Sequence, residues 1–204
     1  MSTVAFRAAQ PSDSGFAFEV AEAASPMSST VALRVATFAD AVALFAVHQD
    51  SVQHLCAPAY PPAQLQVWFE GRSAAMYRPA IDAGRIWLAE CNGGVLGFVG
   101  FVPGEVTLLF VRAQASGSGL GRRLLGLGIE KAQAGFEGPL KVVATRNSQR
   151  FYAAHGFVAV ADHTIVRGDP ALHFAVVEMQ RPRPGTATGP AAAKSGAPAV
   201  AAQD

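Results

Sequence analysis

Three closely spaced glycines, Gly117, Gly119 and Gly121, lie directly ahead of a segment with helical spacing in the stretch "FVRAQASGSGLGRRLLG" (residues 110–126). Glycine permits a positive φ and close approach of a ligand to the backbone. A helix N-terminus offers unpaired N–H groups and a partial positive charge. This combination is typical of a turn that binds an anion, most often phosphate. The sequence therefore predicts a phosphate-binding turn.

The spacing of these glycines excludes two common nucleotide-binding loops. In the dinucleotide fingerprint G-x-G-x-x-G, the third glycine would fall at Leu124 or at Arg122. The nucleoside-triphosphate loop needs G-x-x-x-x-G-K-[ST], but Gly121 is followed by Arg122 and Arg123, so its lysine and its hydroxyl are missing. A different phosphate-bearing ligand is expected.

A second stretch, "RNSQRFYAAHGF" (residues 146–157), completes a pair of motifs that resembles the GCN5-related N-acetyltransferase (GNAT) superfamily. The family pattern is a strand ending in Val, then Q/R-x-x-G-x-G/A at the start of a helix. Here Val111 ends the strand, and Ser116 stands where the family has Gln or Arg. The family's F-Y-x-x-x-G-F signature is intact from Phe151 to Phe157. The resemblance covers residues 31–181.

The resemblance implies transfer of an acetyl group from acetyl-CoA to a primary amine of a small molecule or peptide, by direct attack and without a metal. It implies that Phe110 and Val111 pair through their backbones with the pantetheine arm of coenzyme A. The full set of residues that it assigns to coenzyme A is Phe110, Val111, Ser116, Gly117, Ser118, Gly119, Leu120, Gly121, Arg122 and Asn147. For the acceptor amine it suggests Tyr60, Trp68 and Tyr77.

Two residues are candidates for proton transfer under this resemblance. Tyr152 would protonate the departing thiolate; a tyrosine is a weak acid, with a pKa of about 10, so it releases its proton only as charge develops on sulfur. Glu105 would serve as the base that deprotonates the amine. Because strand side chains alternate, Glu105, Thr107, Leu109 and Val111 are expected on one face of their strand.

Other interpretations stay open. Tyr152 and Trp68 also suit simple core packing, and Glu105 suits a solvated turn. The donor could carry a longer acyl chain than acetyl. Because Ser116 replaces the family's Gln or Arg, a non-catalytic regulatory module that binds coenzyme A is a further alternative.

Composition narrows the class of protein. The chain has 204 residues, 50% of them hydrophobic, and a formal net charge of +1. That balance gives no general attraction to nucleic acid or to a membrane surface. The two cysteines, Cys56 and Cys91, form no metal-binding or disulfide pattern. With no signal peptide and no apolar run of about 18 residues, a cytoplasmic protein is expected, with a homodimer left open.

Hydrophobic periodicity predicts one mixed α/β domain over residues 31–181, with a mainly antiparallel central sheet flanked by helices in the order β-α-α-β-β-β-α-β-α-β-β. Residues 1–30 are expected to be a flexible extension, and residues 182–204 a disordered Ala/Pro/Gly-rich tail. Strands are predicted at 30–37, 85–91, 95–101, 105–111, 139–145, 163–168 and 172–180, and helices at 38–55, 61–81, from the glycine turn to about 136, and at 148–156.

Overall fold

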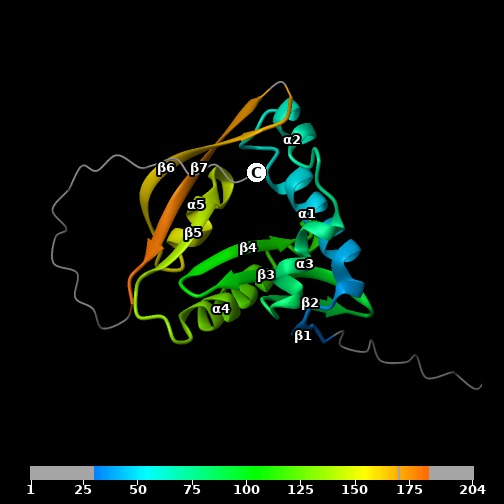
Figure 1. The fold of residues 1–204 in the computed structure, drawn as a ribbon, viewed down its shortest axis with the longest axis vertical. Coiled ribbons are helices and arrows are strands. Elements are labelled where there is room, and N and C mark those ends of the chain that lie inside the picture. The colour runs from blue at the N-terminus through cyan, green and yellow to red at the C-terminus, as the bar shows by residue number, and fades with distance from the viewer. Residues whose placement is uncertain (1–29, 170, 184–204) are drawn as a thin grey trace, which may run out of the picture.

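The computed structural model describes residues 30–169 and 171–183, so nearly all of both predicted terminal segments lies outside the described residues. Its frame is a seven-stranded sheet in the order β1-β2-β3-β4-β5-β7-β6 (Figure 1). All neighbouring strands are antiparallel except β4 and β5, so the predicted mainly antiparallel sheet is confirmed. The strands are β1 (Ala32–Val35), β2 (Ile86–Cys91), β3 (Gly94–Val102), β4 (Glu105–Val111), β5 (Leu140–Thr145), β6 (Val158–Arg167) and β7 (Leu172–Arg181).

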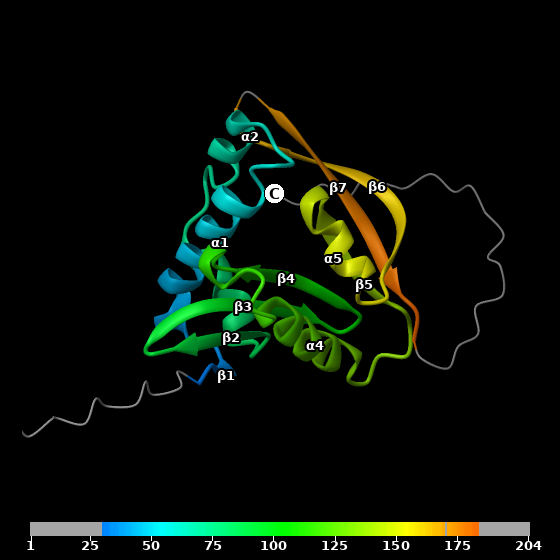
Figure 2. The same ribbon diagram turned by 180° about the vertical axis from the view of Figure 1, so that it is seen from behind.

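Helices cover both faces of the sheet (Figures 1 and 2). They are α1 (Ala41–Leu55), α2 (Pro62–Val67), α3 (Arg78–Asp82), α4 (Leu120–Gln133) and α5 (Gln149–Ala153). On β3, Val99 belongs to the cluster packed with α4, while its neighbour Phe98 belongs to the cluster packed with α1 and α3. Successive side chains of β3 therefore pack into two separate hydrophobic cores, one on each face of the sheet.

The predicted helix at 61–81 is wrong as a continuous element. The chain forms α2, then a loop, then a 3-10 turn over Ala74–Tyr77, and then α3. Gly71 in the loop adopts a φ of +69°, which is incompatible with a continuing α-helix. Pro79 lies in the first turn of α3, where its missing N–H costs no helical hydrogen bond. The break places Arg72 in a loop.

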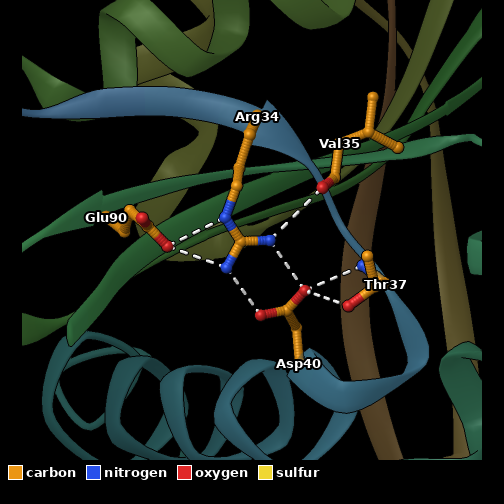
Figure 3. A network of polar contacts seen from close by, with 5 residues as sticks. All are labelled: Arg34, Val35, Thr37, Asp40 and Glu90. Atoms are coloured by element: carbon orange, nitrogen blue, oxygen red, sulfur yellow. Dashed lines mark hydrogen bonds and ion pairs between the residues drawn. The ribbon is translucent and has the colours of Figure 1, made fainter. Parts of the chain in front are cut away.

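An ion-pair network fixes the start of the domain (Figure 3). Arg34 on β1 bonds through Nη2 to Asp40 Oδ1 at 2.7 Å and through Nε to Glu90 Oε2 on β2 at 2.9 Å. Asp40 also accepts hydrogen bonds from the backbone N–H and hydroxyl of Thr37. The hydrogen bonds from Arg34 hold the pKa of Asp40 well below its usual range. The network thus ties the edge strand to the turn that leads into α1.

Candidate active site

The sheet opens between β4 and β5. The register of these two parallel strands contains one pair, Glu105 with Lys141. Beyond this pair the strands diverge, so the edge of β4 up to Val111 is not covered by β5. A cavity of about 810 Å³ lies along this edge, a size within the range of about 300–1,000 Å³ typical of small-molecule sites. An uncovered strand edge has backbone N–H and C=O groups that are free to form hydrogen bonds with another extended chain. The gap is therefore suited to an extended ligand.

A β-bulge at Thr107 changes which side chains share a face of β4. Gly100 pairs with Leu108 and Phe101 with Val106, so Thr107 is an extra residue in the ladder. Val106 and Leu109 both pack in the cluster around α4, three positions apart rather than two. The expectation that Glu105, Thr107, Leu109 and Val111 share one face is therefore wrong, because the bulge resets the alternation between Glu105 and Leu109.

The glycine turn closes one end of the large cavity. Gly117 and Gly119 have φ values of +79° and +86°, and a Cβ added at either would meet no atom within 4 Å. The left-handed backbone, rather than crowding, therefore favours glycine at both positions. Gly119 is the N-cap of α4, so the N–H groups of the first turn have no helical acceptor. Alternating backbone conformations of this kind form concave sites for anions.

The structure gathers most of the predicted coenzyme A residues in this one cavity. Ser118 donates its hydroxyl to Ala115 O at 2.7 Å and so closes the turn. Leu120 does not line the cavity, because its side chain is buried in the core beneath α4. Asn147 lines it while donating its Nδ2 to Leu55 O at 2.9 Å. The predicted residues among the lining are Phe110, Val111, Ser116, Gly117, Ser118, Gly119, Gly121, Arg122 and Asn147.

Tyr152 of α5 lines the same cavity. Its side chain is 6% exposed and packs edge-on between the rings of Phe151 and Phe157. Burial raises its pKa well above the ordinary value. Every fully buried side-chain N or O atom of the described residues has a hydrogen-bond partner, whereas the Tyr152 hydroxyl has none among them. The hydroxyl is thus a protonated donor that protein atoms do not completely enclose.

A second cavity, of about 210 Å³, adjoins the first. Five residues line both cavities, namely Thr107, Leu108, Phe110, Val143 and Thr145. The two spaces therefore meet where β4 and β5 diverge, beside the bulge. Trp68 lines the second cavity, as do His48, Arg72 and Arg167. This arrangement gives one long chamber and one small chamber with a shared wall.

Besides Leu120, three of the predicted site residues line neither cavity. Tyr60 is buried and donates its hydroxyl to Ala175 O at 2.7 Å. Tyr77 is 1% exposed, and its hydroxyl lies 2.8 Å from His48 Nδ1. Glu105 lies at the closed end of the gap, with its carboxylate 3.1 Å from the Lys141 ammonium. The two tyrosines thus lie in the protein interior, outside both cavities. Nothing in this geometry supports a base role for Glu105.

His48 is a site residue that the sequence analysis missed. The indole of Trp68 donates to His48 Nε2 at 3.4 Å, so Nδ1 carries the hydrogen and donates to the Tyr77 hydroxyl. The imidazole stacks on Phe110 with 3.7 Å between ring centroids. Burial lowers the pKa of His48 to about 3, so the ring is neutral at neutral pH. Only packing, and no local sequence signal, places this side chain at the second cavity.

Comparison with known proteins agrees with this geometry. Residues 82–159 match the family model described as "Acetyltransferase (GNAT) domain". They span β2 to β5, the glycine turn and α5. The fold also matches a GCN5-related N-acetyltransferase from Rhodopseudomonas palustris ("Aminotransferase, Class-II"), with 25% identity, a TM-score of 0.66, and coverage of 76% of this chain and 97% of that one. Residues 82–159 therefore match a GNAT acetyltransferase domain.

Two further solved structures share the fold of this chain. The PaiA N-acetyltransferase of Thermoplasma acidophilum, in complex with coenzyme A, has a TM-score of 0.59 at 16% identity, covering 74% of this chain and 99% of that one. The putative acetyltransferase YncA of Salmonella typhimurium, with acetyl-CoA, has a TM-score of 0.57 at 22% identity, covering 79% and 99%. No curated protein matches the chain.

The described part of the chain lacks two kinds of feature. Among residues 30–169 and 171–183, no three His, Cys, Asp or Glu side chains are grouped so that they could hold a metal ion. In the same described part of the chain, no helix has both the length and the apolar character needed to cross a membrane.

Proposed function

We propose that this GNAT domain transfers an acetyl group from acetyl-CoA to a primary amine. The observation that carries the proposal is the gap between β4 and β5, with the glycine turn at one end and Tyr152 in its wall. The N–H groups of the turn, together with Arg122, would bind the pyrophosphate. The uncovered edge of β4 would pair with the pantetheine arm at Phe110 and Val111. The thioester would then lie beside Thr107, where the two cavities meet.

The reaction follows from this placement. The amine nitrogen, entering from the small cavity, attacks the carbonyl carbon of the thioester, so that a C–N bond forms as the C–S bond breaks. The departing thiolate takes the hydroxyl proton of Tyr152. No Asp or Glu lines either cavity among the described residues. The proton that the nitrogen loses therefore passes to water and returns to the Tyr152 phenolate, which leaves acetylated amine and free thiol.

Direct attack is favoured over transfer through a cysteine. Cys56 lines the large cavity, but burial raises the pKa of its thiol to about 11. The thiolate is the nucleophilic form of cysteine, and this thiol is protonated at neutral pH. Cys91, the other cysteine, lines neither cavity. The amine itself is therefore the proposed nucleophile.

The test is thiol release from acetyl-CoA, measured with and without a panel of primary amines. Release that depends on an added amine, with the acetylated amine identified by mass spectrometry, is the expected result. Coenzyme A binding without transfer to any amine would instead support a non-catalytic regulatory module. Running the same assay with longer acyl-CoA donors tests the proposed preference for acetyl.

A further inference from the structure

Two arginines from distant parts of the chain line the small cavity. Arg72 lies in the loop after α2, and Arg167 is the last residue of β6. In Figures 1 and 2, α2 lies beside the far end of the β6–β7 hairpin. A hydrogen bond from Gln64 Nε2 to His173 O, at 2.8 Å, holds the two elements together. This docking brings the two cationic side chains to one chamber.

Neither charge has an ion-pair partner among the residues that the structure describes. Arg72 is half-buried, and within the described part of the chain its guanidinium forms no hydrogen bond or ion pair. Arg167 donates to the backbone O of Val166 at 3.1 Å, and it too has no ion-pair partner among the described residues. Burial lowers the pKa of Arg72, and the charge of Arg167 lowers it further. A partly buried cation without a counter-ion is unfavourable, so the chamber favours an anionic group.

The carboxylate of Glu70 does not fill this role. Glu70 lies close to Gly168 at the tip of the hairpin, but it forms no ion pair with either arginine in the described residues. The pair of guanidinium groups is thus left facing the cavity. Guanidinium forks match the planar geometry of a carboxylate and bind it through paired hydrogen bonds.

The remaining walls set the size and polarity of the occupant. They are built mainly of apolar and aromatic side chains, namely Trp68, Leu108, Phe110, Val143, Ile165, Phe174 and Val176. The volume of about 210 Å³ is below the range of about 300–1,000 Å³ for drug-sized ligands. The chamber therefore suits a small molecule with an apolar body.

We propose, on the basis of the proposed acetyl transfer, that the acceptor is a small primary amine that carries a carboxylate, of the size of a single amino acid. Its carboxylate is bound by Arg72 and Arg167, and its amine points to the junction at Thr107. An amine without an anionic group would bring its ammonium into a chamber that already holds two positive charges, which Coulomb repulsion disfavours. The two arginines are thus specificity-determining residues.

The first experiment compares matched acceptors. Thiol release from acetyl-CoA is measured with each standard L-amino acid, with its amide, and with the amine left when the carboxylate is removed. For the acids that are used, kcat/KM is expected to exceed that of the amide and of the amine by about tenfold or more, because hydrogen bonds to charged groups are strong. Peptides with a free N-terminus and an amidated C-terminus are expected to react poorly.

The second experiment assigns the preference to the two side chains. Arg72→Gln and Arg167→Gln are each expected to raise KM for the acids by about tenfold, with a smaller change in kcat and little change for the amides. Arg78→Gln is the control, because Arg78 is exposed, pairs with Asp82, and lines neither cavity. Unchanged affinity for coenzyme A, measured by calorimetry, shows that all three variants are folded.

The outcomes separate the two proposals. The carboxylate proposal would be overturned if amides, simple amines or amidated peptides reacted as well as the acids and the arginine variants behaved like the wild type. That result would leave acetyl transfer intact. Failure of every amine to release thiol would overturn acetyl transfer instead. In that case, calorimetric titration of the acids and amides decides the carboxylate proposal: acid binding lost in Arg72→Gln supports it, and equal binding or none overturns it.

Discussion

Glu105 and Lys141 face each other where β4 and β5 pair, and their carboxylate and ammonium groups lie 3.1 Å apart. The pair marks the closed end of the gap that holds the large cavity. Glu105 lines neither that cavity nor the small one. Its position at the start of β4 therefore indicates a role in joining the two halves of the sheet, not in proton transfer.

Glu105→Gln is expected to leave turnover unchanged across the pH range and to lower the free energy of unfolding by at most about 1 kcal/mol, because partly exposed ion pairs contribute little. Initial rates at neutral and high pH, together with urea unfolding, measure both quantities. A fall in turnover at neutral pH that recovers at high pH would instead identify Glu105 as the base.

Tyr152→Phe is expected to lower kcat by about 10²–10⁴-fold, the range typical of general acid catalysis, while affinity for coenzyme A changes little. The cavity wall keeps its shape because only the hydroxyl is removed. Tyr60→Phe is the matched control. The Tyr60 hydroxyl bonds to Ala175 O and to the backbone N of Arg146, outside both cavities, so that variant should lose stability without losing kcat. Wild-type turnover in Tyr152→Phe would show that the ring serves packing alone.

Two glycines in α4 give opposite predictions for stability. Gly126 is exposed, and a Cβ there would meet no atom within 4 Å, so Gly126→Ala should stabilise the domain by about 0.5–1 kcal/mol. At Gly128 an added Cβ would lie 2.6 Å from Val99 Cγ2, in the fully buried core. Gly128→Ala should therefore destabilise it, by about 1–3 kcal/mol. Urea denaturation of both variants checks the signs; stabilisation by Gly128→Ala would contradict the packing of α4 on β3.

The local parts of the fold could be predicted from the sequence. Short, nearly continuous apolar runs bounded by turn residues mark β2, β3 and β4. Asn92 and Gly93 both adopt positive φ in the tight turn that joins β2 to β3. The glycine turn before α4 was predictable because closely spaced glycines indicate a turn in which the backbone adopts positive φ. Each of these features depends on neighbours in the sequence.

The non-local parts could not be predicted. The stretch "EVTLLFV" contains no glycine or proline that would indicate a bulge at Thr107. The expectation that Glu105 lies on the same face of β4 as Leu109 was therefore wrong. The gap between β4 and β5 depends on how few residues of these two strands pair. Arg72 and Arg167 meet only because α2 docks on the β6–β7 hairpin, and no spacing within the sequence shows that contact.

Titration of coenzyme A into the wild-type protein, Gly119→Glu and Gly119→Gln tests the central claim most directly. Glu and Gln are nearly equal in size and suffer the same backbone strain at a φ of +86°, so the comparison isolates the charge. Calorimetry should show saturable binding to the wild type. Affinity should be about tenfold or more weaker in Gly119→Glu than in Gly119→Gln, because the added carboxylate repels the pyrophosphate. Equal affinity in the two folded variants, or no saturable binding to the wild type, would contradict the assignment of the glycine turn to coenzyme A.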